Sequence, residues 1–160
     1  MYKRQRFSAG DAELGAAFEA IRIDVLRQQR DLAKLREEVL AMRQKMIDNH
    51  ANRSGLFNLK HDRGGLIDVE FIVQFLVLGH SHAHPRLTGN LGNIALLGIA
   101  GELGLISCEF AVQVRDAYRE YRRLQHGLRL NGAHYARVDG ASVADHVRAV
   151  RALWQEVLSR

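Results

Sequence analysis

The sequence is short of the residues that usually interrupt or cross-link a chain. Its 160 residues include one cysteine, Cys108, and one proline, Pro85. A single cysteine excludes an internal disulfide framework and a cysteine-rich zinc module. Because proline disrupts helix interiors, a chain with one proline can be helical over most of its length. Aromatic residues make up only 7%, and β-rich chains need more turn punctuation, so these scarcities favour an all-α domain.

Long hydrophobic segments are also absent. The longest apolar run, residues 66–78, contains Asp68, Glu70 and Gln74, so it is too short and too charged to span a bilayer. Residues 1–10 lack the apolar core of a secretory signal. Hydrophobic residues at 47% and charged residues at 26% are typical of a globular domain. We therefore expect a cytoplasmic protein with no membrane partner.

Hydrophobic spacing predicts six helices, over residues 11–29, 31–49, 66–82, 90–103, 108–131 and 142–158. The connections are short, which predicts a compact bundle of about six mostly antiparallel helices. The third helix is apolar all round, so it is predicted to lie at the centre. The first two helices are expected to bury one face each. These faces are Leu14, Phe18, Ile21 and Val25 in the first, and Leu32, Leu35, Val39, Met42 and Met46 in the second.

The most distinctive local sequence is KHDRGGLIDVEF, from Lys60 to Phe71. Gly64 and Gly65 precede a helix whose first turn carries Asp68. Glycine amides at a helix N-terminus can bind an anion. Alternatively, the glycines form a tight turn and Asp68 caps its own helix at N3. The residues alone favour the second interpretation.

No metal site is expected from the acidic or histidine residues. Asp68 and Glu70 are two apart, so on a helix they diverge by roughly 200° and at most one faces any given site. His80, His82 and His84 lack an HExxH pattern and further ligands, which indicates a solvated cluster rather than zinc. Cys108 has no partner in sequence and is expected to be a small buried hydrophobe.

Basic side chains follow one side of the fifth predicted helix and contribute to a net charge of +5. The candidates for partner binding are Arg115, Arg119, Arg122 and Arg129, which fall with His126 in a stripe of roughly 80°. The arginine fork suits carboxylates and phosphates. A nucleic-acid-binding module is the alternative, but stacking aromatics and a known motif are missing, so no nucleic acid is expected. An enzyme using the histidines as metal ligands is a further alternative.

Residues 57–85, FNLKHDRGGLIDVEFIVQFLVLGHSHAHP, resemble the bacterial glutamate-ammonia-ligase adenylyltransferase family. These bifunctional enzymes adenylylate and deadenylylate glutamine synthetase in nitrogen regulation. The resemblance continues through NIALLGIAGELGLI (93–106) and AYREYRRLQHGLRLNG (117–132) and covers most of the chain from 9 to 158. It points to the helical domain that follows the C-terminal, adenylylating half. A related helical domain occurs in the uridylyltransferase that modifies the PII signal protein.

The resemblance implies a division of labour within a longer enzyme. Residues 1–10 would be a tail or linker from a preceding nucleotidyltransferase domain, and residues 11–160 a helical regulatory and interaction domain. No catalytic residue is expected in this chain, because the family's strand-borne acidic pair is missing, and Mg²⁺ and ATP would be bound by the intact enzyme. The implied partners are the nucleotidyltransferase domain and glutamine synthetase, with the PII signal protein as a further candidate. Asn58 stands where an acidic residue is expected in the family.

The predicted docking element is the Gly-Gly turn and its neighbours. Lys60, Arg63 and one of Asp68 or Glu70, with Gly64 and Gly65 shaping the loop, are expected to face the catalytic domain or its nucleotide. A polar loop fixed on a rigid helix is a good docking element, because its anchor does not move. That Asp68 only caps its helix is an equal alternative.

Overall fold

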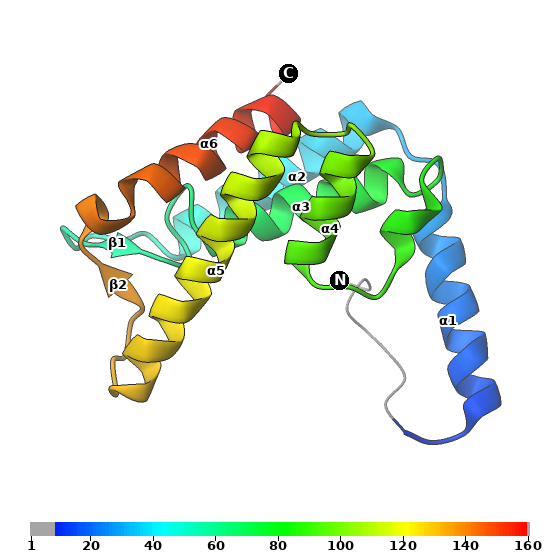
Figure 1. The fold of residues 1–160 in the computed structure, drawn as a ribbon, viewed down its shortest axis with the longest axis horizontal. Helices are drawn as coiled ribbons and strands as arrows, with labels where there is room; N and C mark the ends of the chain where they lie inside the picture. Colours follow the sequence, from blue (N-terminus) through cyan, green and yellow to red (C-terminus); the bar gives the residue numbers. More distant parts are fainter. Residues whose placement is uncertain (1–8, 160) are drawn as a thin grey trace.

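A computed structural model describes residues 9–159. Six α-helices make up most of the fold, with a two-stranded ribbon at one end (Figure 1). The elements in order are α1 (Ala12–Arg27), α2 (Leu32–Asn49), β1 (Phe57–Asn58), α3 (Leu66–His80), η2 (Pro85–Thr88), α4 (Asn93–Glu102), α5 (Cys108–Leu130), β2 (Arg137–Val138), η3 (Gly140–Val143) and α6 (Ala144–Leu158). The predicted all-α class and the six helices are confirmed. Most of the predicted tail 1–10 lies outside the described residues.

Short polar side chains begin three of the helices. Asp11 accepts hydrogen bonds from the amides of Glu13 and Leu14, at 2.7 and 3.1 Å. Asp31 starts α2 in the same way, and Ser107 accepts from the amide of Phe110 at the start of α5. Each side chain satisfies amides that the first helical turn leaves without a partner.

The apolar helix α3 packs against every other α-helix of the fold. It contacts α1, α2, α4, α5 and α6, and nine of its fifteen residues are buried. Phe75, near its middle, is only 3% exposed. Phe71 and Leu78 of the same helix are half-buried, so they are less enclosed than a central apolar helix predicts. The antiparallel order of successive helices stays a prediction.

Helices α4 and α5 approach each other closely at a glycine. A Cβ atom on Gly101 would lie 2.9 Å from the Cβ of Ala111, closer than two carbon atoms can pack. On the same side of α4, Gly98 leaves room for the guanidinium of Arg115, whose Nη1 would lie 3.4 Å from an added Cβ. Gly101 is therefore needed for the close approach of α5, whereas an added Cβ at Gly98 would meet only the end of the Arg115 side chain.

The ribbon joins the segment before α3 to the segment before α6. β1 and β2 run antiparallel, with Phe57 opposite Val138 and Asn58 opposite Arg137. The amide of Leu59 adds a hydrogen bond to the carbonyl of Ala136 at 3.0 Å. This pairing places the turn-rich segment between α2 and α3 beside the elements at the C-terminal end of the fold.

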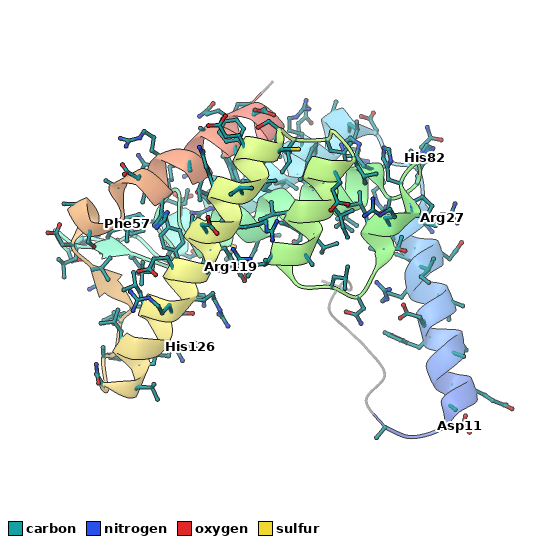
Figure 2. All side chains as sticks on the ribbon, viewed as in Figure 1. Asp11, Arg27, Phe57, His82, Arg119 and His126 are labelled. Carbon is teal, nitrogen blue, oxygen red and sulfur yellow. The ribbon has the colours of Figure 1, made fainter. Side chains whose placement is uncertain are left out.

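The inward face predicted for the first helix is wrong. Leu14 and Ile21 of α1 are 71% and 65% exposed, and Phe18 is also exposed. The buried residues are Gly15, Arg22 and Leu26 instead, because α1 rests on the body near its C-terminal end. Arg22 donates from Nη2 to the carbonyl of Thr88 at 2.7 Å. The helix projects away from the other elements, and Figure 2 labels Asp11 at its far tip.

Two further burial predictions need correction. In α2 the buried stripe is Leu35, Val39 and Arg43, so the predicted face shifts and leaves Met42 54% exposed. Cys108 is exposed rather than buried, because it occupies the first position of α5. Within residues 9–159, no helix is both long and apolar enough to cross a membrane.

Candidate functional site

Residues 57–65, called here the anchored loop, hold their shape through short-range hydrogen bonds. Asn58 Oδ1 accepts from the amides of Lys60 and His61, at 3.0 and 3.2 Å. Asp62 Oδ2 accepts from the amide of Asn58 and from Asn52 Nδ2, both at 2.8 Å. Such side-chain bonds to nearby amides let Asn and Asp replace regular secondary structure in a turn. Asn58, which stands where the family resemblance implies an acidic residue, therefore has a structural role in this turn.

The two glycines of the loop are required by close packing. Gly64 has a φ of +89°, a region in which other residues are strained. A Cβ there would lie 2.9 Å from Val147 Cγ1 in α6, and one on Gly65 would lie 2.7 Å from the carbonyl oxygen of Leu59. The hydroxyl of Tyr121 donates to the Gly64 carbonyl at 3.0 Å. Gly64 thus lets α6 touch the loop backbone, and Gly65 lets the loop fold closely on itself.

The amides of both glycines are engaged inside the chain. Gly64 donates to Asp68 Oδ2 at 2.5 Å, and Gly65 donates to the carbonyl of Asp62 at 3.0 Å. Neither amide is therefore free to bind an external anion, as the anion-site interpretation requires. The tight-turn interpretation is the one that the geometry supports.

A buried ion pair connects the loop to α2. Arg43 Nε lies 2.5 Å from Asp68 Oδ1, and the side chains are 2% and 5% exposed. Arg43 also donates from Nη2 to the carbonyl of His61 at 2.8 Å. Arg43 was not among the residues predicted from the sequence. Its signal was its spacing, since it continues the buried stripe of Leu35 and Val39 at a position where an apolar residue is usual.

Asp68 and Glu70 point to different neighbours, as the helical spacing predicted. Asp68, at N3 of α3, binds the Gly64 amide at the helix start and the guanidinium of Arg43 in α2. Its carboxylate therefore acts within the chain. Glu70 is half-buried and accepts from the hydroxyl of Tyr118 in α5 at 3.2 Å. That hydroxyl in turn accepts from Asn93 Nδ2 at 3.0 Å.

Lys60 and Arg63 are the exposed members of the predicted docking set. Arg63 Nη2 donates to Gln44 Oε1 in α2 at 3.1 Å. The carbonyl of Arg63 accepts from Arg151 Nε in α6, also at 3.1 Å. The loop therefore presents two exposed basic side chains on a backbone that helices on both sides hold in place.

His61 is a titratable group inside this arrangement. Its ring centroid lies 4.1 Å from that of His50, and its Nδ1 is buried without a hydrogen-bond partner in the described part of the chain. The pKa of His61 is lowered to about 4, mainly by burial and further by the nearby charges of His50, Lys60 and Arg43, while Asp62 opposes the shift. The ring is therefore neutral near pH 7.

The arginine stripe on α5 divides among separate local contacts. Arg119 pairs with Asp116 at 2.6 Å, and Arg122 donates to Gln125 Oε1 at 3.1 Å. Arg115 lies over Gly98, and Arg129 is exposed in the last turn. A partner-binding role for these four arginines stays a prediction.

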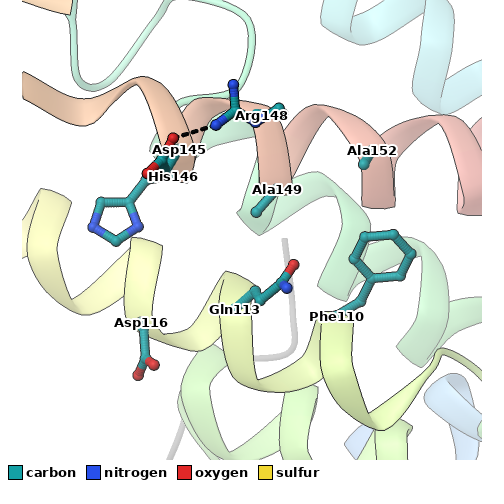
Figure 3. Close-up of a pocket in the computed structure, with 8 residues that line it drawn as sticks. All are labelled: Phe110, Gln113, Asp116, Asp145, His146, Arg148, Ala149 and Ala152. Carbon is teal, nitrogen blue, oxygen red and sulfur yellow. Dashed lines mark hydrogen bonds and ion pairs between the residues drawn. The ribbon is translucent and has the colours of Figure 1, made fainter. Parts of the chain in front are cut away.

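Three surface depressions lie between the helices. The groove between α5 and α6, about 490 Å³, has Phe110 and Gln113 opposite Ala149 and Ala152 (Figure 3). A larger, mostly apolar groove of about 680 Å³ follows α2 and α3 and is lined in part by Met42, Met46 and Phe71. A third of about 380 Å³ lies at the start of α4 beside Tyr118 and Arg122. Neither Lys60 nor Arg63 lines these three depressions.

No metal ligands come together in the described residues. Within 9–159, no group of three or more His, Cys, Asp or Glu side chains is arranged to hold a metal ion. His80 is half-buried. Its pKa is lowered mainly by burial and to a smaller extent by the charge of the neighbouring His84. His82 is exposed at the end of the same segment (Figure 2).

Comparison with known proteins places the chain in a family. Residues 27–135, more than half of the chain, match the family described as GlnD PII-uridylyltransferase. The chain belongs to this family. The matched range of this GlnD family includes Arg43, the anchored loop and Tyr121, whereas most of α1 and all of α6 lie outside it. The hydrogen bond of Arg151 to the loop therefore comes from an element beyond the match.

Curated relatives are bifunctional glutamine synthetase adenylyltransferase/adenylyl-removing enzymes. The protein of Aromatoleum aromaticum is 64% identical over 151 residues, covering 94% of this chain and 16% of the relative. That of Nitrosomonas europaea is 51% identical over 168 residues, covering 96% and 18%. That of Ralstonia nicotianae is 57% identical over 154 residues, covering 96% and 16%. The predicted relation to this enzyme family is confirmed, and the chain spans only 16% to 18% of these three relatives.

Proposed function

We propose that this chain is a non-catalytic helical domain of a glutamine synthetase adenylyltransferase. The support is the 64% identity to such an enzyme and the small share of that enzyme that the chain spans. In this proposal the nucleotidyltransferase domain of the same enzyme binds ATP and Mg²⁺ and modifies glutamine synthetase in the cytoplasm. The chain supports that domain, and the arginines of α5 are available to glutamine synthetase or the PII signal protein.

The observation that carries the proposal is the fixed backbone beneath Lys60 and Arg63. Contacts from α2, α5 and α6 reach the loop through Arg43, Tyr121 and Arg151. A surface that is already ordered loses little conformational entropy when a partner binds. Lys60 and Arg63 are therefore well placed to dock the catalytic domain or to approach the phosphates of its nucleotide.

The test separates docking from folding with one substitution. Arg63→Ala should leave the melting temperature of the isolated chain nearly unchanged, because its side chain is exposed and bonds only Gln44. In the full-length enzyme it should lower adenylylation of glutamine synthetase by about tenfold, the loss of one charge-assisted contact. Arg148→Ala, which removes an exposed arginine from α6, is the matched control and should retain activity. Full activity in the Arg63→Ala enzyme would remove Arg63 from the proposal.

The proposal also makes a statement about the chain by itself. We expect the isolated chain neither to hydrolyse ATP nor to transfer AMP, because the chemistry belongs to the neighbouring domain. The measurement is incorporation of labelled AMP into glutamine synthetase with the purified chain. Incorporation above a no-enzyme control would show that this chain is catalytic.

A further inference from the structure

Acidic and basic side chains around the anchored loop are separated into an inner and an outer set. Asp68 is buried against Arg43 and the Gly64 amide. Asp62 uses Oδ2 to accept from Asn58 and Asn52. The charge of Asp68 is therefore balanced by Arg43, whereas Asp62 is held by neutral groups and leaves one negative charge in the loop.

The outer set consists of three cations: Lys60, Arg63 and Arg151. All three are exposed, and none forms a salt bridge with any residue from 9 to 159. Some exposed arginines elsewhere, such as Arg86 with Glu102 and Arg148 with Asp145, do have an acid beside them. The three cations at the surface of the anchored loop thus exceed the one negative charge that remains there, that of Asp62.

Arg151 joins the set because the loop backbone holds it. Its Nε donates to the carbonyl of Arg63, and its Cγ would lie 3.2 Å from a Cβ on Gly64. The side chain therefore lies against the loop, and its two Nη groups have no partner in the described chain. A guanidinium fixed through Nε keeps a pair of donors free for an external carboxylate.

We propose that Lys60, Arg63 and Arg151 form a binding surface for an acidic protein segment. The proposal rests on the docking role of this loop and names the chemistry of the partner: carboxylates of Glu or Asp that pair with the two guanidinium groups, with Lys60 adding a third positive charge. Arg151, in α6, is the member that the sequence motif did not include.

The distribution of donors favours carboxylates over a polyphosphate. Backbone amides at a helix N-terminus are one means of holding a compact phosphate group, but the Gly64 and Gly65 amides are occupied by Asp68 and Asp62. What remains are three long side chains from two elements, the loop and α6. Cations spread over two elements match separate carboxylates along a peptide better than one small anion.

The test uses a fluorescein-labelled octaglutamate peptide and the 160-residue chain, followed by fluorescence anisotropy at low salt. The R63Q/R151Q variant should bind the peptide at least about tenfold more weakly than the parent chain. The R86Q/R148Q variant removes the same number of charges at sites that already have an acidic partner, so its affinity should fall less than about twofold. Raising the salt should weaken the parent's binding, since exposed charges are screened.

Two outcomes would overturn the proposal. One is an equal loss of affinity in the two double variants, which would mean that only net charge attracts the peptide. The other is tight binding of inorganic tripolyphosphate that R63Q/R151Q abolishes, with no specific binding of octaglutamate. A melting curve for each variant shows that the chain is folded, and R151K, which keeps charge but loses the fork, should bind with intermediate affinity.

The result can be separated from the test of the proposed function. Octaglutamate binding that depends on Arg63 and Arg151, together with full activity of the Arg63→Ala enzyme, would keep the acidic-segment surface and reject docking to the catalytic domain. Loss of activity in Arg63→Ala, with octaglutamate binding that ignores Arg151, would keep docking and reject the three-cation surface.

Discussion

The anchored loop is composed mostly of polar residues and glycine, whereas α1 carries an apolar stripe. Part of the loop is nevertheless buried, and much of the apolar stripe of α1 is exposed. The loop's Gly64 and Gly65 are buried, and so is the side chain of Asp68 that closes on it. In α1, Leu14 and Ile21 are mostly exposed. Polarity therefore does not predict which of the two regions is tightly packed in this chain.

The difference follows from the number of elements that reach each region. The loop receives Arg43 from α2, Asp68 from α3, Tyr121 from α5 and Arg151 from α6. By contrast, α1 is held mainly near its C-terminal end, where Leu26 is buried and Arg22 bonds a carbonyl of η2. A periodic apolar stripe indicates a face suited to burial, but it does not say whether the covering element lies within the same chain.

The largest effect is expected from breaking the buried ion pair. Arg43→Ala should lower the free energy of unfolding by about 3–5 kcal/mol, because it leaves the Asp68 carboxylate buried without its counter-charge. Urea denaturation of the isolated chain measures it. The Arg43→Ala/Asp68→Ala double variant should lose much less than the sum of the single variants. Additive losses would mean that the two side chains do not interact in solution.

A smaller but clear loss is expected from closing the space at the Gly-Gly turn. Gly64→Ala should cost about 2 kcal/mol or more, because the backbone has a positive φ and the methyl group would press on Val147 of α6. Gly55→Ala is the matched control, since a Cβ there meets no atom within 4 Å. If the Gly64→Ala chain has the same free energy of unfolding as the parent, the result would contradict the packing of α6 on the loop.

Acid should weaken the loop through His61. Its pKa is about 4 in the folded chain and about 6.5 in an unfolded one. Between these values the unfolded chain binds the proton and the folded chain does not, so stability falls as the pH falls from about 6.5 toward 4. When the pH is lowered from 7.5 to 5, the melting temperature of the His61→Gln variant should therefore fall less than that of the parent. An equal loss in both proteins would assign the acid sensitivity to other groups, such as His80.

The smallest effects are expected on the exposed stripe of α1. Leu14→Ala and Ile21→Ala should each change the free energy of unfolding of the isolated chain by less than about 0.5 kcal/mol, because both side chains are mostly in water. Leu26→Ala, in the same helix but 2% exposed, should cost about 2–5 kcal/mol. If Ile21→Ala costs as much as Leu26→Ala, the stripe is covered in solution.

Local rules account for the parts of the fold that were predicted from the sequence. The first predicted helix begins at residue 11, where an aspartate is a preferred N-cap, and Asp11 accepts from the first amides of α1. The apolar run 66–78 predicted a helix with buried faces all round, and most of α3 is buried. The Gly-Gly turn before α3 was also expected, since glycine tolerates the positive φ that Gly64 adopts.

The rest depends on contacts between positions far apart in the sequence. The pairing of Arg43 with Asp68 joins positions 25 residues apart, and neither hydrophobic spacing nor a motif specifies the partner of a lone arginine. Arg151 meets Arg63 across 88 positions. In the same way, the exposed face of α1 was mispredicted because periodicity gives the direction of a face but not what lies opposite it.

Native-state hydrogen exchange of individual amides tests the comparison between the anchored loop and α1 most directly. The account predicts that the Gly64, Gly65 and Leu66 amides exchange only when the chain unfolds globally, because each belongs to a buried residue and donates to an acceptor within the loop or α3. The amides in the first turns of α1 should exchange by local fraying, with a far smaller opening free energy. Exchange of the Gly64 amide as fast as that of the first turn of α1 would contradict the claim that the anchored loop is the more firmly held region.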